Sequence, residues 1–107
     1  MLRIHEVIIE LVRFTAPVAA EIARHDSALA KQYREALSSV ALNTAEGSDQ
    51  RGARRASHYS MALGSARESW SALRTAAAWG YIAEPSDEMR NRFDHVIGTL
   101  YKVAHRR

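Results

Sequence analysis

The sequence predicts an all-α protein, an antiparallel up-down-up-down four-helix bundle in which residues 1–107 form a single domain. Apolar residues recur every three or four positions almost from end to end, and three short turn-forming stretches interrupt this period. No stretch alternates with the period of two that marks a half-buried strand. Short connections favour antiparallel neighbours. The predicted helices cover about 2–24, 28–46, 53–79 and 87–105.

The first predicted helix has one apolar stripe and an internal proline. Pro17 removes a backbone hydrogen bond, so we expect a kink there or two shorter helices. The stripe consists of Ile4, Ile8, Leu11, Thr15, Val18 and Ile22.

The second predicted helix can be capped by Asp26 or Ser27, whose side chains accept bonds from free first-turn amides. We expect it to end at Gly47, a residue that readily adopts the left-handed conformation. Its stripe consists of Leu29, Tyr33, Ala36, Val40 and Asn43.

The third predicted helix follows the polar turn "GSDQRG" and stops at Gly80. It carries two neighbouring stripes, so we expect it to lie centrally with partners on two sides. One stripe is Tyr59, Leu63, Ala66, Trp70, Leu73 and Ala77; the other, mostly small, is His58, Ala62, Ser65, Ser69, Ala72 and Ala76.

The fourth predicted helix follows Pro85, which blocks continuation of the third. Ser86 can cap it, and Asp87 and Glu88 suit its positive end. Its inner stripe is Met89, Phe93, Val96, Leu100 and Val103.

Two of the predicted helices carry a second row of apolar residues, so their apolar surface is wider than one core-facing stripe requires. We expect this surplus to cover other copies of the chain, although a generous core with a few exposed apolar residues would also explain it. The rows are Ile9, Val12, Ala16, Ala19 and Ala23 in the first helix, and Ile97, Tyr101 and Ala104 in the fourth.

Composition favours a soluble, cytoplasmic protein. The chain has no cysteine, which excludes a disulfide framework and thiolate metal sites, and no apolar run long enough to span a membrane. Net charge is +3, and arginine makes up 13 of the 15 basic residues. The arginine fork suits phosphate and carboxylate groups, but a genome rich in G and C would also produce the excess.

No arrangement of residues predicts catalysis or a cofactor. The Glu-x-x-His pairs of di-metal bundle enzymes are absent, and the five histidines form no His-x-x-x-His pair. "GSDQRGARR" lacks the spacing and ending of a phosphate-binding loop. We therefore expect a protein that is not an enzyme, with no metal and no cofactor.

Three polar residues flank the turn between the second and third helices. Asn43, Glu46 and Glu68 should face inward or towards the turn. Buried polar groups need partners, so we expect a hydrogen-bond network that pins the end of the second helix to the third, in preference to the alternative of a binding role.

The segments "SSVALNTAEG", "ALGSARE" and the Ala72–Ile82 pattern ending in "GYI" resemble a known family. It comprises the small four-helix-bundle proteins encoded by intervening sequences in bacterial 23S ribosomal RNA genes, which are related to accessory proteins of diversity-generating retroelements. Its signature positions are matched by Asn43, Ala45, Glu46, Gly47, Gly64, Ser65 and Glu68. Thr44 stands where the family usually has isoleucine.

The resemblance implies a bacterial protein that assembles into a closed ring, usually a pentamer, with a basic surface that meets nucleic acid. Our first hypothesis is an oligomeric adaptor that binds RNA or DNA backbone, largely independently of base sequence. The second is a scaffold or protein-interaction module whose arginines solubilise the turn or pair with Glu residues of neighbouring subunits. The expected nucleic-acid-binding residues are Arg51, Arg54, Arg55, Lys102, Arg106 and Arg107.

Overall fold

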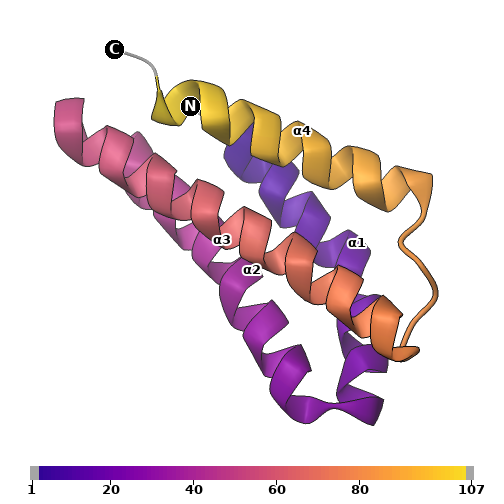
Figure 1. Ribbon diagram of the computed structural model, residues 1–107. Coiled ribbons are helices and arrows are strands. Elements are labelled where there is room, and N and C mark those ends of the chain that lie inside the picture. The colour runs from indigo at the N-terminus through magenta and orange to yellow at the C-terminus, as the bar shows by residue number, and fades with distance from the viewer. Residues whose placement is uncertain (1–2, 106–107) are drawn as a thin grey trace.

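The computed structural model describes residues 3–105, and this part of the chain is all-helical, with four helices and no strand. The bounds differ from the predicted ones by at most two residues where they can be compared. The helices are α1 (Arg3–His25), α2 (Ser27–Ser48), α3 (Gly52–Trp79) and α4 (Asp87–Ala104) (Figure 1).

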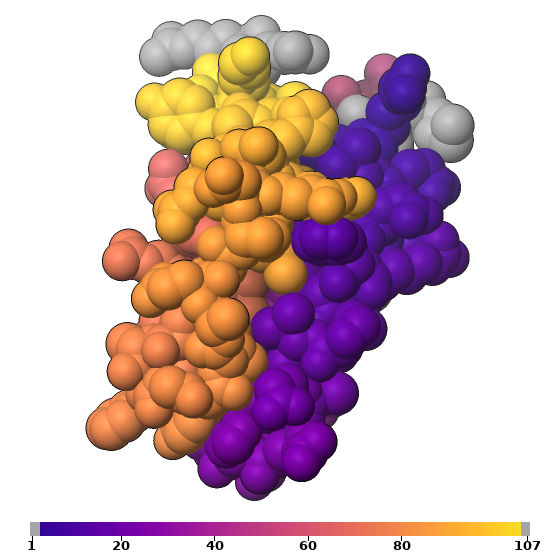
Figure 2. All heavy atoms as spheres, turned by 90° about the vertical axis from the view of Figure 1, so that its right-hand side faces the viewer, coloured from indigo at the N-terminus to yellow at the C-terminus, as the bar shows by residue number. Residues whose placement is uncertain are grey.

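Helices that follow each other in the chain pack against each other. The most extensive contact joins α2 to α3, and smaller ones join α1 to α2 and α3 to α4. The contact between α1 and α4 is the weakest of the four, although the two helices lie side by side in Figure 2. α3 therefore has neighbours on two sides, as its two stripes predict. The molecule measures 42 × 25 × 19 Å.

The predicted stripes supply most of the core, which also includes Leu37 of α2, a residue outside the predicted stripes. Ile8, Leu11 and Ile22 of α1 are almost completely buried, as are Phe93 and Leu100 of α4. The stripe of small residues on α3 is also buried at Ala62, Ser69, Ala72 and Ala76. The apolar side chains among them, removed from water, provide the main force that holds the helices together.

Two predicted N-caps and one predicted stop are confirmed. The Asp26 carboxylate accepts a bond from the Leu29 amide at 2.9 Å, and the Ser86 hydroxyl accepts one from the Met89 amide at 3.1 Å. Gly80 has φ +83°, in the left-handed region, and ends α3. Its amide donates to Ala77, and the Tyr81 amide reaches back to Ala76, which completes a Schellman motif.

Gly47 does not end α2, so that prediction is wrong. The helix continues to Ser48, and Gly47 has no positive φ. Its role is close approach: a Cβ atom there would lie 2.8 Å from Cε1 of the buried Tyr59 ring on α3. A side chain would collide with Tyr59, so glycine lets the last turn of α2 lie directly against α3.

Pro17 lies within α1, which runs through it as one element from Arg3 to His25. The alternative of two shorter helices is therefore wrong, and the kink at Pro17 stays a prediction. Within the described part, no helix is both long enough and apolar enough to span a membrane.

Two hydroxyls on α2 are buried without a hydrogen-bond partner in the described part, those of Tyr33 and Thr44. Burial raises the pKa of Tyr33 to about 12, and the neighbouring Thr15 side chain opposes the rise. Tyr33 and Thr15 help to line a cavity of about 280 Å³ between α1 and α2. An unpaired buried hydroxyl costs about 1–3 kcal/mol.

Candidate nucleic-acid interface

A ladder of polar side chains joins α2 to α3 beside the turn that connects them. The Asn43 amide nitrogen donates to the Ser39 carbonyl at 3.1 Å and to its hydroxyl at 3.0 Å. The Asn43 oxygen lies 3.1 Å from His58 Nδ1, so it accepts a proton that Nδ1 carries. Further along, the Ser65 hydroxyl donates to Ser39 at 2.9 Å. The predicted network between the two helices is present at Asn43.

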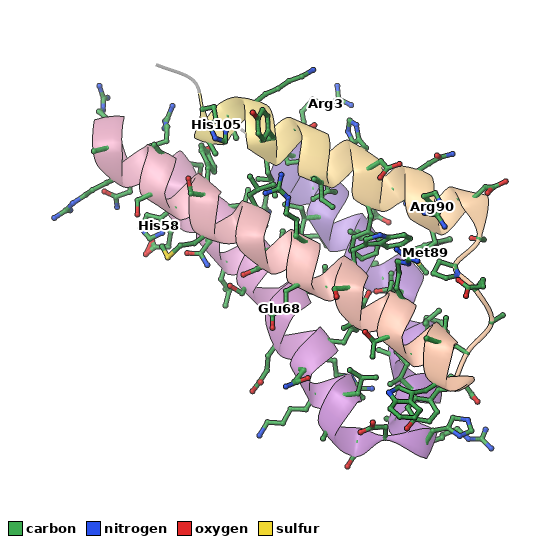
Figure 3. All side chains as sticks on the ribbon, viewed as in Figure 1. Arg3, His58, Glu68, Met89, Arg90 and His105 are labelled. Atoms are coloured by element: carbon green, nitrogen blue, oxygen red, sulfur yellow. The ribbon has the colours of Figure 1, made fainter. Side chains whose placement is uncertain are left out.

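The other two residues of that prediction do not take part. Glu46 and Glu68 are exposed, so the prediction that they face inward is wrong. Gly64, the remaining signature residue, is also exposed, and a Cβ atom there would meet nothing within 4 Å. Figure 3 shows the labelled Glu68 side chain on the outside of α3.

The start of α3 carries the arginine cluster, defined here as Arg51, which is the N-cap, and Arg54 and Arg55 of the first helical turns. All three are exposed, but their surroundings differ. Arg55 donates from Nε to the Gln50 carbonyl at 3.0 Å and from a terminal nitrogen to the Ser48 carbonyl at 3.4 Å. Arg55 therefore holds the turn and satisfies a carbonyl at the end of α2. Arg51 and Arg54 have neither a side-chain hydrogen bond nor an ion pair within residues 3–105.

The electrostatics of the turn run against ordinary helix preferences. Arg51 is the N-cap of α3 and makes no side-chain capping bond, and the first turn of α3 holds no acid. A helix N-terminus carries partial positive charge and free amides, which favour anions. The arginine cluster adds three cations there, with Asp49 as an exposed acid in the turn. The effect is a concentration of positive charge that helix stability does not explain.

The cluster also acts on one buried residue. Burial raises the pKa of Tyr59, while the positive charge of Arg55 opposes the rise. Tyr59 is the residue against which Gly47 packs, so the fold beneath the cluster is held in place by close contact.

The remaining predicted basic residues lie at the end of α4. Lys102 is exposed in its last turn, while Arg106 and Arg107 fall outside the described residues. In Figure 1 the end of α4 and the α2–α3 turn lie towards the same end of the molecule.

Sequence reasoning missed two features of this region. The pairing of His58 with Asn43 joins residues 15 apart in the chain, and only the packing register of α2 on α3 brings them together. The turn-holding role of Arg55 was also missed, since its neighbours Arg51 and Arg54 look equivalent in sequence. Over the described residues, no group of three or more His, Cys, Asp or Glu side chains could hold a metal ion.

The comparisons with known proteins agree with the resemblance noted in the sequence. No curated protein and no solved structure matches the chain significantly. The model of one family, described as 23S rRNA-intervening sequence protein, matches residues 2–102. This range covers α1, α2 and α3 completely and nearly all of α4. The chain therefore belongs to the family of 23S rRNA-intervening sequence proteins.

Proposed function

We propose that this protein is a small, non-enzymatic, oligomeric adaptor that binds the backbone of RNA or DNA. The observation that carries the proposal is the pair of exposed, unpaired arginines, Arg51 and Arg54, at the N-terminal end of α3. Guanidinium groups bind phosphate bidentately, and free helix amides add to the attraction. Arg55 contributes charge but is held by turn carbonyls.

The proposed assembly is a homo-oligomer of four-helix bundles with an antiparallel up-down-up-down course, and a closed ring such as a pentamer is the form that the family resemblance favours. Short connections support this course, because Asp26 alone separates α1 from α2 and residues 49–51 separate α2 from α3. Exposed apolar side chains support self-association. They include Val12 and Tyr101 from the predicted surplus rows, together with Leu42 and Met61, whereas Ala19 and Ala104 of those rows are buried in the core of the chain itself.

We place the adaptor in the bacterial cytoplasm. The absence of cysteine suits a reducing compartment, and the family match supports a bacterial source. No arrangement of acids, bases or nucleophiles supports an enzymatic role.

The test is salt-dependent binding of labelled RNA and DNA by the purified protein. Each phosphate contact contributes about 0.7–0.9 to the slope of log affinity against log salt. R51A/R54A should therefore weaken binding to all sequences and lower the slope by about 1.4–1.8. R34A/R67A removes the same charge from exposed positions of α2 and α3 and is the matched control.

The alternative function is an oligomeric scaffold that binds protein partners without nucleic acid. Leu42 and Met61 favour it, since both are exposed on the helices joined by the polar ladder. Light scattering would give the subunit number, and identification of co-purifying molecules would separate the two functions. Binding that is absent at low salt, or equal in R51A/R54A and the wild type, would reject the adaptor and leave the scaffold.

A further inference from the structure

Three aromatic rings are stacked at the end of the molecule where α3 stops, far from the arginine cluster. The centroids of the Tyr81 and His25 rings are 5.4 Å apart, with 6° between the ring planes. The centroids of the Tyr81 and Trp79 rings are 6.4 Å apart, with 18° between the ring planes. His25 comes from the end of α1, Trp79 from the end of α3 and Tyr81 from the following loop. We call this set the ring stack.

Folding accounts for two members of the ring stack but not for the third. Tyr81 is half-buried against the core, so its ring helps to fix the α3–α4 loop. His25 lies 3.2 Å from Glu21 of its own helix, which holds the imidazole beside Tyr81. Trp79 is 70% exposed, the most exposed large apolar side chain in the described part. An indole left largely in water gains little of the burial energy that usually favours tryptophan.

We propose that the free surface of Trp79 receives an unpaired nucleobase, which extends the ring stack by one member. This inference rests on the proposed function and deepens it, because it adds base contact to backbone contact. Every nucleobase has a planar π face, so stacking on an aromatic side chain tolerates any sequence. The nearly parallel rings fix the plane in which the base lies.

One exposed cation, Arg24, lies next to the ring stack in the sequence and offers a phosphate contact there. Arg24 precedes His25, its side chain is 78% exposed, and its nitrogen is 3.8 Å from Glu21. Such a long, solvated pair is weak, so Arg24 is free to contact a phosphate. The arginine cluster stands at the opposite end of the 28-residue helix α3, about 40 Å away at 1.5 Å per residue. The ring stack is therefore a second contact point on the strand, separate from the first.

Fluorescence of Trp79 tests the proposal directly, because the chain has only two tryptophans. The other, Trp70, is half-buried, 5.3 Å from the Phe93 ring and 5.1 Å from the Arg90 guanidinium. Trp70→Phe leaves Trp79 as the only indole. The probes are a single-stranded RNA of mixed sequence and an abasic oligonucleotide of equal length, which carries phosphates without bases.

The RNA should quench Trp79 emission, and the abasic strand should bind without quenching. Trp79→Ala should lower affinity for the RNA by about tenfold and leave affinity for the abasic strand unchanged. Trp79→Phe, which keeps a stacking ring, should retain most of the affinity. If Trp70→Phe does not fold, the comparison of Trp79→Ala with Trp79→Phe in the otherwise wild-type chain decides the question.

Three results would overturn the proposal. Binding of RNA without quenching, and with equal affinity in Trp79→Ala, would reject the base contact and leave backbone binding intact. Absence of binding by either strand would reject the adaptor function as well. Protection of Trp79 from acrylamide without nucleic acid, together with a smaller assembly for Trp79→Ala, would assign the indole to contact with a second copy of the chain.

Discussion

The two ends of α3 follow opposite rules. At the C-terminal end the residues stabilise the helix. Gly80 adopts the left-handed conformation, and the amides of Gly80 and Tyr81 donate to carbonyls of the last turn. The N-terminal end has what helix stability disfavours. An arginine occupies the cap without a capping bond, and no acid lies in the first turn.

The difference separates folding from function. Natural sequences agree with local preferences nearly everywhere, and departures from them concentrate at functional or strained sites. The arginine cluster is such a departure. The packing of α2 on α3 beneath it, called the rigid base here, is fixed by the contact of Gly47 with Tyr59 and by the hydrogen bond between Asn43 and His58. A rigid base keeps the cations in one arrangement, which favours binding of an extended polyanion.

The largest expected effect tests the rigid base. Gly47→Ala would place a Cβ atom 2.8 Å from the buried Tyr59 ring, whereas Gly64→Ala would meet open space. Overpacking costs about 1–3 kcal/mol, and replacing glycine by alanine in a helix gains up to about 1 kcal/mol. In urea unfolding, Gly47→Ala should be destabilised and Gly64→Ala stabilised, with about 2 kcal/mol between them. Equal stabilities would mean that close approach does not fix α2 on α3.

The second-largest expected change in stability concerns the C-terminal end of α3. Gly80→Ala forces a side chain into the left-handed region and should cost about 1–2 kcal/mol. Gly98→Ala, at an exposed position inside α4 with no neighbour within 4 Å, is the control and should be neutral or stabilising. Thermal unfolding compares the two. A stable Gly80→Ala variant would show that the stop of α3 depends on other residues.

A smaller effect tests Thr44, which stands near the end of α2 where the family resemblance leads one to expect isoleucine. Its side chain is fully buried and its hydroxyl has no partner in the described part. Thr44→Val keeps the shape and removes the unpaired group, so stability should rise by about 1 kcal/mol. Denaturant unfolding measures this change, and Thr44→Ser, which keeps the hydroxyl, should not gain stability. A loss of stability in Thr44→Val would show that the hydroxyl is bonded.

The sequence predicts the elements well because apolar period and capping residues are local signals. The stripes of α1 and α4, and the caps at Asp26 and Ser86, could be assigned from residues a few positions apart. Gly47 shows the limit of this reasoning: glycine near a predicted helix end suits either a stop or a close contact, and only the position of Tyr59 decides.

Long-range pairing limits prediction of the candidate site in the same way. The exposure of the arginine cluster was predictable from its polar surroundings. The bonds of Arg55 to turn carbonyls were not, because they depend on how the backbone between Ser48 and Gln50 is folded. The prediction that Glu46 and Glu68 face inward was wrong because a helix carries more polar residues than the contact between α2 and α3 can bury.

One substitution tests most directly whether the N-terminal end of α3 serves binding rather than folding. Arg54→Glu replaces a cation by an anion in the first turn of α3, where negative charge is favoured by about 0.3–1 kcal/mol. Stability and affinity for labelled RNA should be measured on the same sample. We expect stability to rise by about 0.5 kcal/mol while affinity falls at least tenfold and loses part of its salt dependence. Unchanged affinity, or a fall in stability, would contradict a binding role for this end of α3.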